Sequence, residues 1–415
     1  MIARCRAIFS DANRQGMDSI MSRGDAHRQM RRHTLELILN ALAVGPLDKR
    51  SIQRQTARSW GAVSEGIAFL EERGVVKSDG LLEEGKLGRR ASAYCLDAKR
   101  NISLGMALND SKVFTSAVSL SGELVFKDEL ECEGHISSSN ALSRVHAACR
   151  AAMKNAAIDA SQVGQLCLAL PGAVNSQEGI WVRAPFPSLK GPVDFGREIK
   201  LGSKHSIPLN AEHDLSAMAQ AIMKRESWSE PNFAFLNFSD GVGMVVSLNG
   251  SYFSGVNGYA CEIGHIPFAS GADARDCRCG KKGCLETLLS CGGIAYAAKR
   301  QFGLGDGKSF KTLTRSMGEE CRLRLFEELL PQIERACVSV VTLFDPGTIV
   351  LGGPALEPWL DLLRERLPEK LSAGNWLNAP VDVRFYKGGD REECAYGSAL
   401  RAAGLLMSGI SAELA

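Results

Sequence analysis

From residue 102 onward, strand-like and helix-like segments alternate, and this alternation limits the possible fold more than any other feature of the sequence. The strand-like runs lie at 102–108, 112–124, 164–172, 207–214, 233–250, 347–353 and 381–389. Helix-like segments separate several of them, among them 141–157 and 215–224. Strands that alternate with helices predict an α/β fold with mixed sheets.

The first hundred residues have a different pattern, that of short helices followed by strands. Apolar residues at helical spacing mark a first helix within 33–45, namely Leu35, Ile38, Leu39 and Leu42. Asp48 can cap a second helix over 48–57, and Ser59 can cap a third over 59–74. Strand-like segments follow at 74–80 and 92–97. We therefore expect a winged helix-turn-helix over residues 31–98, with residues 1–30 as a mobile extension.

The charge of the chain is unevenly distributed. Residues 1–100 hold 18 lysines and arginines against 12 acidic residues, a net charge of +6, so the remainder carries −4 of the overall +2. A basic head favours contact with a polyanion, although a small solvated domain can be basic without one. The wing and the basic charge together favour double-stranded DNA as the partner.

The candidate DNA contacts fall on the helices and on the wing. Arg50, Arg54 and Arg58 suit phosphate contacts, whereas the third helix begins with few basic side chains and is poorly suited to reading guanine. Arginines beside a glycine at the tip of the wing suit a narrow minor groove. The full set of candidates is Arg50, Arg54, Arg58, Ser59, Trp60, Ser64, Gly88, Arg89 and Arg90.

The stretch 276-DCRCGKKGCLE-286 places Cys277, Cys279 and Cys284 within eight residues. Gly280 and Gly283 let the backbone fold tightly around an ion. Zinc favours four tetrahedral nitrogen or sulfur ligands, so this loop needs a fourth ligand from elsewhere.

Cysteine usage and the chain's hydropathy indicate the compartment. The 13 cysteines are odd in number and scattered, which argues for reduced thiols and a local metal cluster. The first residues lack the apolar centre of a secretory signal, and no apolar run approaches the ~18 residues of a membrane span. We expect a cytoplasmic protein.

The order of motifs resembles that of the ROK family of repressors, open reading frames and sugar kinases. The matching motifs are 171-PG-172, His213-Asp214, 262-EIGH-265, the cysteine loop, 352-GG-353 and 397-GSA-399. The resemblance implies a two-lobed, actin-like sugar kinase fold after the winged helix-turn-helix. It implies a first lobe over 101–210 and 395–412 and a second lobe over 211–394, with a zinc loop at 265–284.

The resemblance also implies ligand sets. His265 is the family's zinc histidine, so His265, Cys277, Cys279 and Cys284 would form a closed, structural Zn²⁺ site. Residues at five positions are implied to contact sugar hydroxyls: His213, Asp214, Glu262, His265 and Glu286. Asp214 occupies the position of the kinase base, but we expect it to be vestigial or ligand-binding.

Departures from the family's pattern argue against phosphoryl transfer. The phosphate turn of the kinases is replaced by 107-ALNDS-111, where Ala107 removes a carboxylate and Asp110 adds a negative charge that disfavours ATP. Asp240 adds another in the second phosphate segment, and Phe186 stands where the family often has a sugar-binding asparagine. We expect no catalytic residue and no ATP.

The leading hypothesis is a sugar-responsive transcription regulator, a repressor of a carbohydrate uptake or catabolic operon. It would hold a sugar or sugar derivative between its lobes and form a homodimer or homotetramer. One alternative is an active sugar kinase, for a hexose or N-acetylhexosamine, with an accessory DNA-binding domain. Another is a DNA-binding regulator that responds to no ligand.

Overall fold

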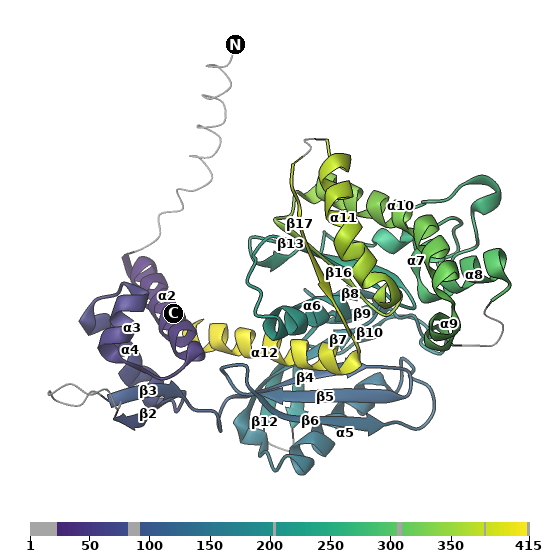
Figure 1. Ribbon diagram of the computed structural model, residues 1–415. Coiled ribbons are helices and arrows are strands. Elements are labelled where there is room, and N and C mark those ends of the chain that lie inside the picture. Colours follow the sequence, from purple (N-terminus) through teal and green to yellow (C-terminus); the bar gives the residue numbers. More distant parts are fainter. Residues whose placement is uncertain (1–22, 82–91, 202–204, 305–308, 377–378, 413–415) are drawn as a thin grey trace.

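The computed structural model describes residues 23–81, 92–201, 205–304, 309–376 and 379–412. These residues form an N-terminal unit, purple in Figure 1, and a larger body built around two sheets. The last helix, α12 (Arg391–Ala412), yellow in Figure 1, runs along the body and ends beside the N-terminal unit.

The N-terminal unit combines helices with a small antiparallel sheet of order β1-β3-β2. Its elements are α2 (Arg23–Val44), β1 (Leu47–Asp48), α3 (Lys49–Thr56), α4 (Trp60–Glu72), β2 (Val76–Leu81) and β3 (Ser92–Leu96). Asp48 caps α3 by accepting a hydrogen bond from the Ser51 amide at 2.6 Å, and Ser59 caps α4 by accepting one from the Ala62 amide at 3.2 Å. The arrangement is consistent with a helix-turn-helix, and both caps lie where the sequence predicts them.

Helix α2 begins earlier than expected. We assigned residues 1–30 to a mobile extension, but α2 starts at Arg23, and residues 1–22 lie outside the described residues. Thr34 donates a side-chain hydrogen bond to the Met30 carbonyl at 2.8 Å, and Arg31 pairs with Glu65 of α4 at 2.7 Å. The segment from 23 to 32 contains four arginines and one each of Gln, Met and Ala, which favour helix, but it has no apolar periodicity. Helix propensity and contacts with α4 extend the helix where periodicity alone gives no signal.

The first sheet of the body has the order β11-β12-β7-β4-β5-β6. Its strands are β4 (Ile102–Leu108), β5 (Lys112–Val118), β6 (Leu124–Glu131), β7 (Val163–Leu170), β11 (Glu198–Leu201) and β12 (His205–His213). We expected one strand over 112–124; instead a turn at 119–123, with Gly122 at a φ of 79°, separates β5 from β6. Helix α5 (Ala141–Asn155) and a small sheet of β8 (Ala173–Asn175), β9 (Ile180–Arg183) and β10 (Val193–Asp194) accompany this sheet.

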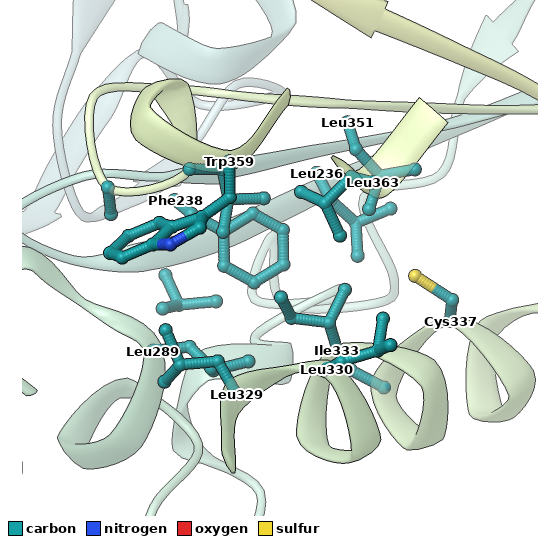
Figure 2. Packing of buried hydrophobic residues seen from close by; sticks show 14 of the residues in the cluster. Leu236, Phe238, Leu289, Leu329, Leu330, Ile333, Cys337, Leu351, Trp359 and Leu363 are labelled. Carbon is teal, nitrogen blue, oxygen red and sulfur yellow. The ribbon is translucent and has the colours of Figure 1, made fainter. Parts of the chain in front are cut away.

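The second sheet has the order β15-β14-β13-β16-β17. Its strands are β13 (Phe233–Phe238), β14 (Val242–Leu248), β15 (Ser251–Tyr252), β16 (Thr348–Gly352) and β17 (Asp382–Tyr386). The helices beside it are α7 (Glu286–Leu289), α8 (Cys291–Phe302), α9 (Phe310–Ser316), α10 (Glu319–Phe344) and α11 (Leu360–Gly374). Figure 2 shows the core between them, where Phe238 of β13 and the buried Trp359 lie opposite Leu330 and Ile333 of α10. The predicted α/β fold with mixed sheets is confirmed.

Helices α6 (Asp214–Arg225) and α12 pack against each other next to the central strand β4. Gly105 of β4 and Gly397 of α12 allow this close packing, because a Cβ at either position would overlap backbone atoms of the neighbouring element. Within the described ranges, the molecule contains no helix with the length and apolar character that crossing a membrane requires.

Candidate functional site

Four of the predicted site residues converge at the edge of the second sheet. His265 ends a short 3-10 helix, Ile263–His265, and Cys277, Cys279 and Cys284 lie in the loop before α7. Their ligand atoms all lie within 4.8 Å of one another. Sγ of Cys277 is 3.6 Å from Nδ1 of His265, and Sγ of Cys279 is 3.7 Å from Sγ of Cys284.

The spacing of these atoms fits a tetrahedral metal ion. A disulfide would need sulfur atoms about 2.05 Å apart, so Cys279 and Cys284 are separate thiols. Four ligands at zinc–sulfur bond lengths of about 2.3 Å have edges of about 3.8 Å, close to the separations seen here. Gly280 and Gly283 have φ values of 91° and 70°, which let the loop turn sharply around this point. The donor set therefore fits Zn²⁺.

Glu286, at the start of α7, is bound by an arginine from the same loop. Its side chain is only 9% exposed, and Nε of Arg278 lies 2.8 Å from its Oε1. Nη2 of Arg278 donates to Oε2 at 2.9 Å, so the pair is bidentate. A Cβ at Gly241 would lie 2.6 Å from Nη2 of Arg278, so the guanidinium also rests against the turn between β13 and β14. The cysteine loop thus contributes a cation as well as thiols.

Glu262 and His265 belong to one turn that is pressed against β14. Between them, Gly264 is buried, and a Cβ there would overlap the carbonyl oxygen of Val242. Glu262 itself is exposed, and its side chain makes no capping hydrogen bond to this turn. The turn therefore holds His265 at the cysteine cluster and leaves the Glu262 carboxylate at the surface.

His213 and Asp214 lie where β12 ends and α6 begins. Nδ1 of His213 accepts a hydrogen bond from the Leu215 amide at 3.1 Å, so His213 caps α6. The Asp214 side chain is 9% exposed, and Arg391, the first residue of α12, donates a hydrogen bond through Nη1 to its Oδ2. The other oxygen, Oδ1, lies 3.3 Å from Nδ1 of His213.

The ion pair with Asp214 changes the electrostatics of Arg391. Burial lowers the pKa of the Arg391 guanidinium, but attraction to Asp214 outweighs this effect and leaves that pKa above its ordinary value. Arg391 is therefore a permanent cation at this point.

The turn at 107–111, where the ROK resemblance would place a phosphate loop, is held by side chains from other segments. Oδ2 of Asp110 lies 2.6 Å from Nδ1 of His135, and its Oδ1 accepts from the Ile136 amide at 3.2 Å. The hydrogen bond from His135 is the main cause of a lowered pKa at Asp110. Nη1 of the buried Arg144 donates to the Asp110 carbonyl at 2.6 Å. The Asp110 carboxylate thus stabilises the local chain and stays ionised.

Phe186 packs within the first lobe. Its ring lies edge-on to the buried Trp181, with ring centroids 6.0 Å apart and an angle of 85° between the planes. Both residues belong to the apolar cluster of the first sheet, in which Phe186 is partly buried. The side chain at this position contributes apolar packing and offers no hydrogen bond.

The candidate DNA contacts are spread over the N-terminal unit. Arg50, Arg54, Ser59 and Trp60 are exposed, whereas Arg58 and Ser64 are half-buried. Gly88, Arg89 and Arg90 lie outside the described residues. The exposed candidates on α3 and at the start of α4 therefore share the surface of one small unit.

A cavity of about 330 Å³ lies between α2 and α4, away from the cysteine cluster and from Asp214. Its lining includes Arg58, whose Nε is buried and has no hydrogen-bond partner among the described residues. All the residues that line the cavity belong to the N-terminal unit.

Sequence reasoning missed the two arginines that bind the site's buried carboxylates. Arg278 was visible within the cysteine motif, eight residues before Glu286, and a cation so close to a candidate ligand could have been singled out. Arg391 is 177 residues from Asp214, and no periodicity or motif in the chain links the two. Folding alone brings them together.

Comparison with known proteins identifies relatives of two kinds. A sequence profile of the ROK family matches residues 119–399. An N-acetyl-D-glucosamine kinase from Pasteurella multocida (strain Pm70) is 27% identical over 240 residues, which are 53% of this chain and 74% of the relative.

Two solved structures share the fold. A ROK family transcriptional regulator, described as a homologue of the E. coli MLC protein, aligns with a TM-score of 0.76 and 18% identity, over 93% of this chain and 98% of its own. A ROK family glucokinase from Streptomyces griseus, in complex with glucose and AMPPNP, aligns with a TM-score of 0.56 and 20% identity, over 73% of this chain and 99% of its own.

Proposed function

The chain belongs to the ROK family, and from this premise we propose that it is a DNA-binding transcription regulator whose activity depends on a bound sugar or sugar derivative. In this proposal the protein is a repressor of carbohydrate genes. The N-terminal unit binds the operator, and the ligand lies between the two lobes. A homodimer would present two such units to paired half-sites.

The observation that carries the proposal is the N-terminal unit itself. The regulator fold aligns with 93% of this chain, whereas the glucokinase fold aligns with 73% while using 99% of its own length. The additional part, with its helices and small sheet, supports a regulator. The net charge of +6 over residues 1–100 supports a nucleic acid as its partner.

The state of the former catalytic positions supports the same proposal. Asp214 would have to accept a proton from the attacking hydroxyl, but it is already paired with Arg391. Asp110 keeps a negative charge in the turn where a kinase cradles phosphate, and like charges at close range repel. We infer that the site binds its ligand without phosphorylating it.

We further propose that His265, Cys277, Cys279 and Cys284 hold one structural Zn²⁺. Three thiolates and an imidazole fill a tetrahedral shell, so no position would remain for a reactive water. Because Nδ1 of His265 faces the thiols, Nε2 stays available to a ligand. The ion would fix the loop that carries Arg278 and leads into Glu286.

For the sugar site we propose His213, Asp214, Glu262, His265 and Glu286. Asp214 and Glu286 are buried carboxylates that can accept hydrogen bonds from hydroxyl groups. Glu262 and His265 share the turn at the edge of the second sheet, next to the cysteine loop. Asp214 follows β12 of the first sheet, whereas Glu286 begins α7 beside the second sheet, so a bound sugar that contacts both would favour one relative position of the two sheets.

The test of DNA binding uses a labelled duplex from the region upstream of the protein's own gene. We expect tight binding that weakens steeply between 50 and 200 mM salt, because phosphate contacts release counterions. Arg54→Ala and Arg89→Ala should weaken binding and lower the salt slope by about one each. Arg364→Ala, an exposed arginine on α11, is the control and should bind as the wild type does. Equal binding by all variants contradicts the assignment of the N-terminal unit.

Ligand response is tested separately, by thermal shift against glucose, N-acetyl-D-glucosamine and their 6-phosphates. A ligand that binds the folded state raises the melting temperature. Asp214→Ala should abolish the shift. If the protein binds its operator but none of these sugars raises its melting temperature, it is the ligand-independent regulator.

A sugar kinase is the alternative that a specific observation favours, since the matched curated relative is an N-acetyl-D-glucosamine kinase. Its test is turnover of ATP with N-acetyl-D-glucosamine or glucose. If the protein turns over ATP with one of these sugars and Asp214→Asn abolishes that turnover, the protein is a sugar kinase and the regulator proposal is wrong.

A further inference from the structure

Helix α12 is a single element that contacts both the proposed ligand site and the proposed DNA-binding unit. Its first residue, Arg391, pairs with Asp214, while its last turns reach the N-terminal unit. The twenty residues from Arg391 to Ile410 span about 29 Å at the rise of an α-helix. Figure 1 shows the helix running between these two regions.

The first half of α12 is locked to α6, the helix that begins at Asp214. A Cβ at Gly397 would overlap the carbonyl oxygen of Ala217, so the two helices touch backbone to backbone. On the other side, a Cβ at Gly105 of β4 would overlap backbone atoms of Ala395 and Ala399. With no flexible side chain between these backbones, neither helix can shift here without moving the other.

The second half of α12 belongs to the core of the N-terminal unit. Ile410 is buried there, and Leu406 and Met407 pack against the same apolar cluster. That cluster includes Leu35 and Leu39 of α2 and Ile67 of α4. A movement of α12 along or about its axis must therefore change the packing of the helices that carry the candidate DNA contacts.

At the ligand end, Asp214 has capacity for one more partner. Its Oδ2 accepts from Arg391, whereas its Oδ1 faces Nδ1 of His213, which already accepts a hydrogen bond from the Leu215 amide. A ligand hydroxyl can donate to Oδ1. Arg391 has further N–H groups that can donate to a ligand oxygen. A ligand at Asp214 therefore competes with or re-aims the guanidinium at the start of α12.

We propose that Arg391 is a ligand-site residue, and that α12 carries the state of the Arg391–Asp214 pair into the core of the N-terminal unit. The ligand is a polyhydroxylated molecule with a donor hydroxyl for Asp214 and an acceptor oxygen for Arg391. This inference rests on the proposed function and adds the route by which ligand binding changes DNA binding. The coupling is reciprocal, so operator DNA must change ligand affinity by the same factor.

The first test needs neither ligand nor DNA. Amide hydrogen exchange is measured on the full chain in the wild type, in Arg391→Gln and in Arg391→Lys. We expect Arg391→Gln to raise exchange about tenfold in residues 35–42 and 63–70, and Arg391→Lys to lie between it and the wild type. The matched control is Arg366→Gln, which breaks the exposed ion pair between α11 and Glu327 of α10 and should leave those residues unchanged.

Unchanged exchange in the N-terminal unit of Arg391→Gln would overturn the proposal. If Arg391→Gln does not fold, Asp214→Asn is used instead, because it removes the negative charge of the ion pair and keeps the shape of the side chain. Unchanged exchange in the N-terminal unit of Asp214→Asn would likewise overturn the proposal. Because this measurement involves no operator and no sugar, its result stands whether or not the proposed function survives.

The second test separates binding from transmission. Each of glucose, N-acetyl-D-glucosamine and their 6-phosphates is added to the wild type, Arg391→Gln and Ile410→Ala. For any of these that raises the wild-type melting temperature, we expect changed exchange in residues 35–42. Ile410→Ala should keep the thermal shift and lose that change, whereas Arg391→Gln should lose both. If the effect of a sugar on exchange in residues 35–42 persists in both variants, α12 is not the route. Comparison of the neutral sugars with their 6-phosphates shows whether Arg391 donates to an oxygen of the sugar or to a phosphate oxygen.

Discussion

At the scale of single residues, the body of the protein places ionisable groups in surroundings that change their chemistry. Glu212, next to the site residue His213 on β12, is buried, with Oε1 3.7 Å from Sγ of Cys167. Burial raises the pKa of Glu212 to about 7, against a lowering effect of Arg401. We therefore expect the stability of the region around β12 to depend on pH.

The first prediction follows from the sign of that shift. Because the folded-state pKa of Glu212 lies above the ordinary 4.5, the folded state binds the proton more tightly than the unfolded state does. This contribution to stability is fully present below about pH 4.5 and is lost as pH rises through about 7. The expected loss is roughly 3 kcal/mol. Glu212→Gln, which stays neutral, should therefore gain stability relative to the wild type between pH 5 and pH 8.

The measurement is thermal or urea unfolding of both proteins at pH 5 and pH 8. Glu178→Gln, at an exposed position, is the control and should not change the pH dependence. A difference between Glu212→Gln and the wild type that is the same at both pH values would contradict the shifted pKa.

At the scale of elements, the glycines of α12 have unequal roles. Gly397 belongs to the motif 397-GSA-399, one of those that resemble the ROK family, and in the structure its missing side chain lets α12 touch α6. Gly404, two turns later, has open space where a Cβ would be. The same residue type is thus required at one position and replaceable at the other.

The second prediction compares these two positions. Gly397→Ala should destabilise the protein by more than about 2 kcal/mol, because the new methyl group overlaps the Ala217 carbonyl oxygen. Gly404→Ala should stabilise it by up to about 1 kcal/mol, since alanine favours a helix interior. Urea unfolding of the two variants measures both effects. Equal effects of the two substitutions would show that the close contact of α12 with α6 is not maintained in solution.

The cysteine loop is the second element whose behaviour can be predicted. If it holds a structural ion, the purified protein contains about one zinc per chain, and Cys284→Ser loses it together with thermal stability. Cys337→Ser, at a buried cysteine of α10 outside the cluster, is the control and should keep its metal. Elemental analysis and melting curves give both readouts. A metal-free wild type with unchanged stability under a chelator would show that the loop holds no structural zinc.

At the scale of the whole molecule, the N-terminal unit is joined to the body by a shared core as well as by the chain. Leu120 of the body and Ile410 of α12 lie in the same apolar cluster as Leu35, Ile52 and Ile67 of the N-terminal unit. A unit packed in this way takes its position from the body. If the unit binds DNA as we propose, a change in the body can alter how the unit meets DNA.

The fourth prediction tests that shared core by limited proteolysis. Ile410→Ala removes buried methyl groups at a cost of about 2–5 kcal/mol, and cleavage should become faster within residues 23–100 first. Ile294→Ala, a fully buried position of α8, should instead speed cleavage in the second lobe. Identical cleavage patterns in the two variants would mean that Ile410 does not support the N-terminal unit.

Much of the architecture was predictable because it depends on local pattern. Helical spacing marked Leu35 to Leu42, Asp48 and Ser59 supplied caps, and alternating segments indicated the mixed α/β fold. The ROK resemblance, drawn from short motifs, is confirmed by the match over residues 119–399. The cysteines and His265 were expected to meet, and the structure brings their ligand atoms within 4.8 Å.

What the sequence by itself determined, then, are the features that neighbouring residues encode: periodicity, caps, turns and a metal-binding spacing. The tertiary structure alone decided that Arg391 pairs with Asp214, that His135 and Arg144 hold Asp110, and that α12 ends in the core of the N-terminal unit. An ion pair between residues far apart in the chain leaves no periodic trace, because its energy depends on a distance that exists only after folding. The proposed regulation depends on two of these contacts, the Arg391–Asp214 pair and the packing of the end of α12 in the N-terminal core, and each joins segments that lie far apart in the sequence.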